Sequence, residues 1–268
     1  MLTERAPWQW RRTLPRVAAA VAVVLGAGLV AFFVAGGLTH VDVAKLRPVS
    51  VPPAATPSPA AIPIADVGRN ALPSIVTIEA DRTGDEALGT GWLFDSRGDF
   101  VTNAHVIEGQ LSVRITDRHA HTHVAVVVGI DVNADIAMVR AGDGFSGTPL
   151  PVNTTPLSSI PLDVVALASS RATGQGDITT ERVALLHQEV PLQNGEVQPG
   201  SSAPTVYHDM FDLEGARIYQ GNSGGPVLDR AGMVIGIITL ASPSGRDSFA
   251  IPITRVIAEL NQFAARTG

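Results

Sequence analysis

Residues 220–227 read QGNSGGPV, a serine set among three glycines and a proline. This composition is typical of a tight turn between strands. The glycines also leave the backbone around Ser223 free of side-chain bulk, which a nucleophile approached by a substrate requires. G-x-S-x-G matches are short and occur often by chance. Residues elsewhere in the chain must therefore decide whether Ser223 is a turn residue or a nucleophile.

A nucleophilic serine needs an adjacent base. The only lysine is Lys45, so a serine–lysine dyad in the rest of the chain is excluded and a histidine remains. The α/β-hydrolase fold places its histidine after the serine, but no histidine follows His208. The opposite order, His then Asp then Ser, is found in chymotrypsin-like barrels. His105 in FVTNAHVI and Asp135 in VNADIAMVR precede Ser223 in that order.

The chain after residue 72 consists of short runs rich in β-formers, such as SIVTIEA, HVAVVVG and MVIGIITLA, separated by turn signals such as DSRGD. Runs of this length and spacing predict an all-β sandwich or barrel rather than alternating βα units. One helix is expected near the C-terminus, over about Thr254–Ala265, because apolar residues recur there at helical spacing.

The blocks TNAHVI, DIAMV and GNSGGPV, in this order, resemble the three catalytic blocks of trypsin-like serine proteases, most closely those of the HtrA/DegP-like branch. The likeness covers most of residues 65–259, including GTGWLFDSRGDFVTNAHVI and SFAIPI. The resemblance implies an all-β, chymotrypsin-like domain of two packed six-stranded barrels, with the active site between them and a C-terminal helix after them.

The resemblance also implies a role for each matching residue. His105 acts as the general base, Asp135 orients it, and Ser223 attacks the peptide carbonyl. The N–H groups of Gly221 and Ser223 form the oxyanion hole. The substrate adds as a strand along the edge formed by Ile238, Thr239, Leu240 and Ala241. The function expected is that of a serine endopeptidase with no cofactor and no metal.

Some features depart from the family pattern. Asn222 occupies the position where digestive enzymes of this fold carry an aspartate, so we expect no activation by N-terminal cleavage. Too few residues follow FAIPI for a PDZ domain, which normally follows in the HtrA-like branch. Residues 173–217 are unlike the family, in which the corresponding loops shape the substrate pocket and the oxyanion hole. An inactive resting state of the site is therefore an alternative to an active one. Arg217 within them is interpreted as a solvated loop residue; pointed inward, it would favour acidic substrates.

Residues 17–38 carry no charge over a length that can cross a bilayer as a helix. A cleaved signal peptide is the alternative, although its apolar region is usually shorter. Arg5, Arg11, Arg12 and Arg16 precede the span, so the N-terminus is expected in the cytoplasm. The expected organisation is a cytoplasmic tail (1–16), a transmembrane helix (17–38), a proline-rich linker (39–64) and a protease domain (65–268). The protein is thus expected at the cell membrane, single-pass, with an extracytoplasmic catalytic domain.

The net charge of −6 argues against a nucleic-acid partner, and the lack of cysteine excludes disulfides and thiol nucleophiles. The cluster HAHTH, with His119, His121 and His123, is interpreted as a solvated hairpin edge; zinc binding by histidines on one strand face is the alternative. The expected partners are protein or peptide substrates and the membrane. The alternative function is a catalytically silent protease-like domain that binds peptides or partner proteins.

Overall fold

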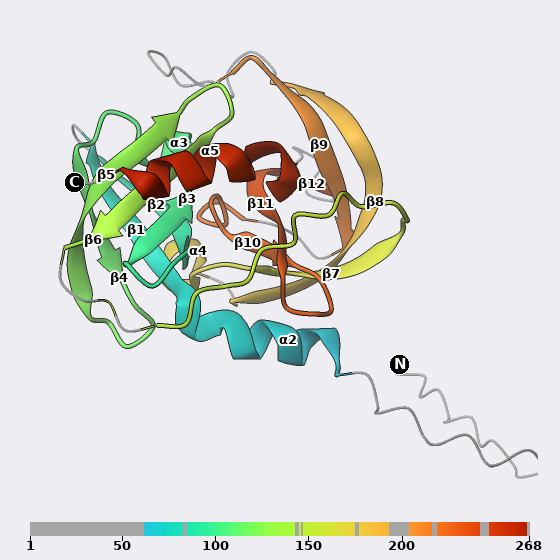
Figure 1. Ribbon diagram of the computed structural model, residues 1–268, viewed down its shortest axis with the longest axis horizontal. Coiled ribbons are helices and arrows are strands. Elements are labelled where there is room, and N and C mark those ends of the chain that lie inside the picture. The colour runs from blue at the N-terminus through green and yellow to red at the C-terminus, as the bar shows by residue number, and fades with distance from the viewer. Residues whose placement is uncertain are drawn as a thin grey trace, which may run out of the picture. The chain divides into compact units, whose positions relative to one another are not determined.

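The described strands form two closed antiparallel barrels through the hydrogen bonds between neighbouring strands (Figure 1). In this computed structural model the described residues are 62–82, 85–142, 145, 147–174, 177–192, 204–215, 219–241 and 247–266, without the side chains of residues 82, 85, 86 and 247. The strand order is β1-β2-β3-β6-β5-β4 in the first barrel and β10-β11-β12-β9-β8-β7 in the second.

The strands of the first barrel are β1 (Ile75–Arg82), β2 (Asp85–Leu93), β3 (Asp99–Thr102), β4 (Ser112–Thr116), β5 (Thr122–Asp131) and β6 (Ile136–Ala141). Those of the second are β7 (Leu162–Leu167), β8 (Ile178–Pro191), β9 (Val206–Gly215), β10 (Pro226–Leu228), β11 (Val234–Ala241) and β12 (Asp247–Pro252). The helices are α2 (Ile64–Ala71), the 3₁₀ turn η2 (Leu72–Ser74), α3 (Ala104–Ile107), α4 (Ser170–Thr173) and α5 (Ile253–Ala265).

Each barrel has its own apolar interior, and a third cluster joins the two. Ile78, Phe100 and Ile115 lie in the first interior, and Val183 and Leu213 lie in the second. The third cluster takes residues from both barrels, from α2 and from α5. Its fully buried members include Trp92, Met138, Leu228, Ile237 and Leu260. Burial of this cluster fixes one barrel against the other, which is a condition for any site made from both.

Helix α5 packs on strands of both barrels (Figure 1). Phe263 lies where a Cβ atom on Gly129 would be, 2.1 Å from its Cγ, so only glycine at 129 lets the helix approach β5. Arg140 on β6 donates to both oxygens of buried Asp99, at 2.6 and 2.9 Å, and to the carbonyls of Ala264 and Arg266. The end of α5 is therefore tied to the first barrel by hydrogen bonds as well as by packing.

The predicted fold class is confirmed for the described residues: an all-β chain of two six-stranded barrels followed by a C-terminal helix. Helix α2, which buries Val67 and Ala71, was not expected from the sequence. No helix in the described residues has the length and apolarity needed to cross a membrane. The predicted span, 17–38, lies outside the described residues, and the predicted domain boundaries stay predictions.

Candidate active site

His105 and Asp135 come together although they lie on different elements of the first barrel. His105 is the second residue of α3, and Asp135 ends the turn before β6. The ring Nδ1 lies 2.9 Å from Asp135 Oδ2 and 3.0 Å from Oδ1, and the main-chain N–H of His105 also donates to Oδ1 at 3.0 Å. Asp135 is 1% exposed, so its carboxylate depends on these partners in place of water.

The backbone of Asp135 is held in an uncommon conformation. Its φ is +54°, in the left-handed region that aspartate enters more readily than most residues. The side-chain amide of Asn103 donates to the Asp135 carbonyl at 2.8 Å and to Thr239 Oγ1 at 3.0 Å. Buried Asn103 therefore links the turn that carries Asp135 to β11 of the second barrel.

Tyr207 on β9 is a further partner of this carboxylate. Its hydroxyl donates to Asp135 Oδ2 at 3.0 Å, and the residue is 4% exposed. Burial is the main cause that raises the pKa of the Tyr207 phenol, and the nearby negative charge of Asp135 raises it further. The phenol therefore stays protonated and remains a hydrogen-bond donor. The segment unlike the family thus reaches the centre of the predicted site.

Ser223 lies in a turn that packs against the first barrel. Its Oγ donates to the main-chain carbonyl of Thr239 at 3.3 Å, and within the described residues this is the hydrogen bond of that hydroxyl. The Asn222 side chain is buried and accepts from the Tyr219 N–H at 3.1 Å, so it closes the turn locally. QGNSGGPV is thus a turn, as its composition indicates.

Within the described part of the chain, the predicted oxyanion-hole donors have no protein acceptor. Neither the Gly221 nor the Ser223 N–H donates to another described residue. Gly221 has φ +96°, and a Cβ there would lie 2.5 Å from the carbonyl oxygen of Ala172 in α4. Glycine at 221 is therefore required by both backbone conformation and space, and it leaves two N–H groups available for a ligand oxygen.

Thr90 on β2 holds both residues of that predicted hole. Its hydroxyl donates to the Gly221 carbonyl at 2.7 Å, and its main-chain N–H donates to the Ser223 carbonyl at 2.9 Å. The Ser169 N–H donates back to Thr90 Oγ1 at 3.0 Å. Thr90 has no exposed surface, so these bonds are shielded from water. Thr90 is not recognisable from the local sequence, because only the fold brings β2 to the nucleophile turn.

The predicted substrate strand is the end of β11. Pairing with β10 covers β11 as far as Ile237, and the Ile238 N–H and carbonyl bond to Gly225 and Gly224. Among the described residues no strand pairs with 239–241 on that side, while β12 covers the other side up to Ala241. Within the described residues, this edge of β11 thus lacks the strand partner that an added substrate strand would supply.

The family model of the trypsin-like peptidase domain matches residues 89–237, more than half of the chain. The chain belongs to the trypsin-like peptidase family. The matched range contains His105, Asp135 and Ser223, and it ends just before the predicted substrate strand.

Curated relatives place the chain beside the HtrA/DegP-like proteases. It is 34% identical to Protease Do-like 1, chloroplastic, of Arabidopsis thaliana over 64% of this chain and 38% of that protein. It is 33% identical to Serine protease HTRA2, mitochondrial, of Bos taurus over 88% of this chain and 51% of that protein. The chain thus spans about half or less of the length of these relatives.

A solved structure with the same fold is the active form of the Rv3671c protease from M. tuberculosis. It matches with a TM-score of 0.62 and 26% identity, over 83% of this chain and 95% of that one. The predicted likeness to trypsin-like, HtrA-type proteases is confirmed by these comparisons.

The histidine cluster lies away from this trypsin-like site. His119 and His121 are in the turn between β4 and β5, where His121 contacts Asp117, and only His123 is on β5, beside Phe145. The hairpin interpretation is confirmed, and the alternative of three histidines on one strand face is wrong because the strand begins at Thr122. No group of three metal-ligating side chains occurs among the described residues. Arg217 lies outside them.

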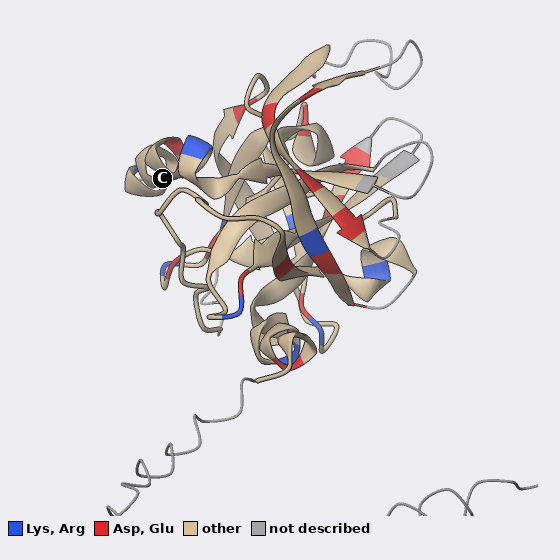
Figure 2. Cartoon of the chain, turned by 90° about the vertical axis from the view of Figure 1, so that its right-hand side faces the viewer, with Lys and Arg blue, Asp and Glu red and all other residues tan. Residues whose placement is uncertain are grey.

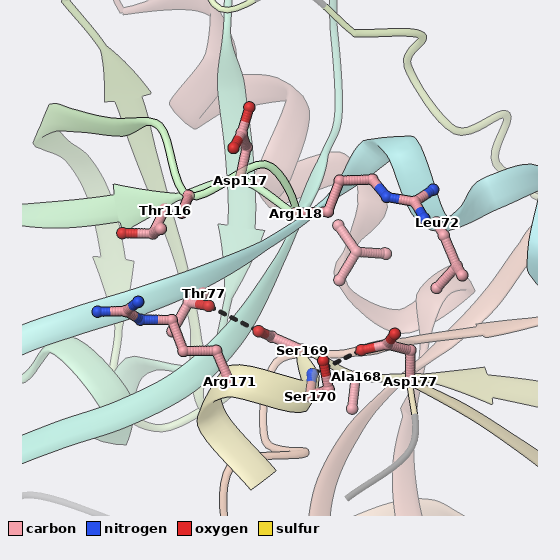
Figure 3. A pocket seen from close by; sticks show the side chains of 12 residues that line it. Leu72, Thr77, Thr116, Asp117, Arg118, Ala168, Ser169, Ser170, Arg171 and Asp177 are labelled. Carbon is pink, nitrogen blue, oxygen red and sulfur yellow. Dashed lines mark hydrogen bonds between the residues drawn. The ribbon is translucent and has the colours of Figure 1, made fainter. Parts of the chain in front are cut away.

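A cavity of about 260 Å³ lies beside α4 and is lined by Ser169, Ser170 and Arg171 (Figure 3). The Thr77 and Ser169 hydroxyls hydrogen bond there at 2.6 Å. None of the predicted site residues lines it. The cavity is linked to the predicted site only through neighbouring residues. Ser169, which lines the cavity, also donates its N–H to Thr90, and Ala172 of α4 lies against Gly221.

The face that carries β8 and β9 is predominantly acidic. Figure 2 turns the right-hand side of Figure 1 to the viewer, with Asp and Glu in red. The acidic residues that these strands expose at least in part are Glu189, Asp209, Asp212 and Glu214, against the basic Arg182, while Glu181 is buried.

Proposed function

We propose that the protein is a membrane-anchored serine endopeptidase that hydrolyses peptide bonds of extracytoplasmic proteins through His105, Asp135 and Ser223. The observation that carries the proposal is the pairing of His105 with buried Asp135 in a member of the trypsin-like peptidase family. The unused N–H groups of Gly221 and Ser223 support it, because an acyl-transfer site needs such donors.

The chemistry follows from these positions. Ser223 Oγ attacks the substrate carbonyl carbon and gives its proton to His105 Nε2, while the carbonyl oxygen takes up negative charge between the Gly221 and Ser223 N–H groups. His105 then protonates the leaving amine, and an acyl-enzyme remains on Ser223. Water, deprotonated by His105, hydrolyses this ester and restores the serine. Asp135 stabilises the imidazolium throughout.

The first step requires a change from the resting geometry. The Ser223 hydroxyl, now on the Thr239 carbonyl, must turn toward His105. Hydrogen bonds between catalytic groups are often long or misaligned without substrate and tighten when it binds. A substrate strand added along 239–241 places its carbonyl beside Ser223, and so favours the turned hydroxyl.

A fluorophosphonate probe tests the proposal on the full chain in detergent, with Ser223→Ala, His105→Ala and, as a matched control, exposed Ser112→Ala. We expect labelling of the wild type and of Ser112→Ala, and none of the two site variants. A wild type that neither reacts with the probe nor cleaves an unfolded protein substrate contradicts the enzymatic proposal.

The second candidate function is peptide binding without turnover. The Ser223–Thr239 hydrogen bond favours it, because a serine held on a carbonyl is not activated by a base. In that case peptides bind with equal affinity to the wild type and to Ser223→Ala, and neither protein releases product. Product release by the wild type alone excludes this candidate.

The anchored topology rests on residues 17–38 and on the arginines that precede them. In sealed cells, a tag placed after Gly268 is expected to be accessible to an added protease, and a tag before Met1 to be protected. The reverse pattern, or recovery of the whole chain in the soluble fraction, contradicts the proposed anchoring.

A further inference from the structure

The carboxylate of Asp135 is bound from two directions. From α3 it receives the main-chain N–H and the ring of His105, and from β9 it receives the Tyr207 hydroxyl. These two are the ionisable side chains recorded in contact with it among the described residues. Thr239, the other nearby hydroxyl, donates instead to the Ile237 carbonyl at 3.3 Å.

The position of Tyr207 is fixed by its surroundings. It lies on β9, opposite Val190 of β8, and belongs to the apolar cluster between the barrels. A tyrosine ring held by packing keeps its hydroxyl in place without the entropy cost of ordering a flexible donor. Its single donor proton is used on Asp135 Oδ2.

We propose that Tyr207 is a positioning residue that holds the Asp135 carboxylate against the His105 ring and moderates its pull on the ring proton. The proposal rests on the proposed function of His105 and Asp135. A hydroxyl that donates to a carboxylate shares its negative charge, so less of that charge is left to favour imidazolium. Tyr207 therefore weakens the hold of the Asp135 carboxylate on the ring proton of His105.

Removal of the Tyr207 hydroxyl should shift the pH dependence of kcat/KM in one direction only. Tyr207→Phe leaves the ring and takes away one donor, so Asp135 attracts the imidazolium proton more strongly. The acidic limb of the kcat/KM profile should move to higher pH by about 0.5–1 unit, the size expected for losing one hydrogen bond to a charged group. At acidic pH the rate then falls about 3–10-fold, and at alkaline pH it changes less.

Tyr219 provides a control for the substitution, and fluorotyrosine at position 207 strengthens the donor that Tyr207→Phe removes. Tyr219 is the other tyrosine and is 40% exposed, so in Tyr219→Phe the acidic limb should stay where it is in the wild type. Fluorotyrosine incorporated into Tyr219→Phe labels Tyr207 alone. Its more acidic hydroxyl is a stronger donor, so the acidic limb should move to lower pH. A residue with only a packing role gives neither shift.

A measurement without turnover separates this proposal from the proposed function. In protein that carries both Ser223→Ala and Tyr219→Phe, the His105 ring resonances are followed by NMR as pH changes, with residue 207 as tyrosine, phenylalanine or fluorotyrosine. Titration midpoints in the order phenylalanine, tyrosine, fluorotyrosine from high to low support the proposal even if the wild type cleaves nothing. Coincident midpoints, or the reverse order, overturn it; should Tyr207→Phe fail to fold, the fluorotyrosine comparison decides alone.

Discussion

The hydroxyl of Thr90 donates a 2.7 Å hydrogen bond to the main-chain carbonyl of Gly221, across the boundary between the two barrels. The same residue holds the Ser223 carbonyl through its own N–H. Both residues whose N–H groups are proposed to bind the oxyanion are therefore anchored to one buried residue of β2, Gly221 through its hydroxyl and Ser223 through its main-chain N–H. The conformation of the nucleophile turn depends on the first barrel as well as on its own glycines.

Replacing this hydroxyl should affect turnover more than binding. Thr90→Val keeps the shape of the side chain but leaves the Gly221 carbonyl and the Ser169 N–H unpaired. We expect kcat to fall about 10–100-fold with little change in KM, because losing one oxyanion-hole donor costs about 10²–10³ and misplacing it costs less. Thr90→Ser keeps the donor and should restore most of the rate. Equal kinetics for Thr90→Val and Thr90→Ser contradict the assignment.

Gly224 lies at the same boundary between the barrels, in close contact with the main chain of Thr90. It has φ +87°, and a Cβ there would lie 2.1 Å from the Thr90 carbonyl oxygen, an atom that cannot move aside. Gly224→Ala should remove activity and lower the free energy of unfolding by about 3 kcal/mol or more, from overpacking and an unfavourable φ together.

Gly109 is the matched control, because its φ is +81° and no atom lies near its Cβ position. Gly109→Ala should therefore lower the free energy of unfolding only by the cost of its backbone conformation, about 1–2 kcal/mol, and the variant should keep its activity. Both losses are measured by urea unfolding. Equal destabilisation of the two variants means that contact with Thr90 is not the cause.

The local sequence was enough to predict His105, Asp135 and Ser223 as a group, since each lies in a short block and their order along the chain excluded the alternative fold. The strands were predictable because short runs rich in β-formers are separated by turn residues such as DSRGD. Thr90 and Tyr207 were not predictable in this way: their partners are 131 and 72 residues away, and only barrel packing brings them together.

Helix α2 was missed for a different reason. IADVGRNA follows a proline-rich run and contains a central glycine, both of which argue against a helix. The helix forms because Val67 and Ala71 are buried, and because Gly68 lets it approach Val165 and Leu167 of β7. Tertiary packing here outweighs local propensity.

Arg140 is predicted to stabilise the domain through Asp99. The pair is bidentate, and the Asp99 side chain has no exposed surface. Burial raises the pKa of Asp99 despite the hydrogen bond from Arg140, and its other ion-pair partner, Arg97 at 3.3 Å, is half exposed, so the carboxylate is poorly tolerated there without Arg140. Arg140→Met should lower the free energy of unfolding by about 3–5 kcal/mol, as measured by denaturant titration.

The control is Arg230→Met, which breaks an ion pair with Asp163 at 2.7 Å in which both side chains are about half exposed. Solvent and salt screen such a pair, so little change in stability is expected. A loss for Arg140→Met as small as that for Arg230→Met contradicts the role given to the Asp99 pair and to the end of α5.

The buried carboxyl group of Glu181 should make the free energy of unfolding depend on pH. Its side chain is 6% exposed, Oε2 accepts from Ser248 Oγ at 3.0 Å, and Oε1 has no partner among the residues that the structure describes. Burial raises the pKa of Glu181 to about 7 from 4.5. The folded state therefore binds a proton that the unfolded state releases between these two values, so stability should fall as pH rises from about 4.5 to 7.

The size of this loss is on the order of 3 kcal/mol, at 1.36 kcal/mol for each unit of pKa difference. Glu181→Gln cannot ionise, so it should remove that part of the slope and be more stable than the wild type at pH 8. Glu189→Gln, at an exposed glutamate on the same strand, should keep the wild-type slope. Urea unfolding of the three proteins at pH 5 and pH 8 tests this, and parallel losses for all three would mean that Glu181 does not carry its proton into the folded state.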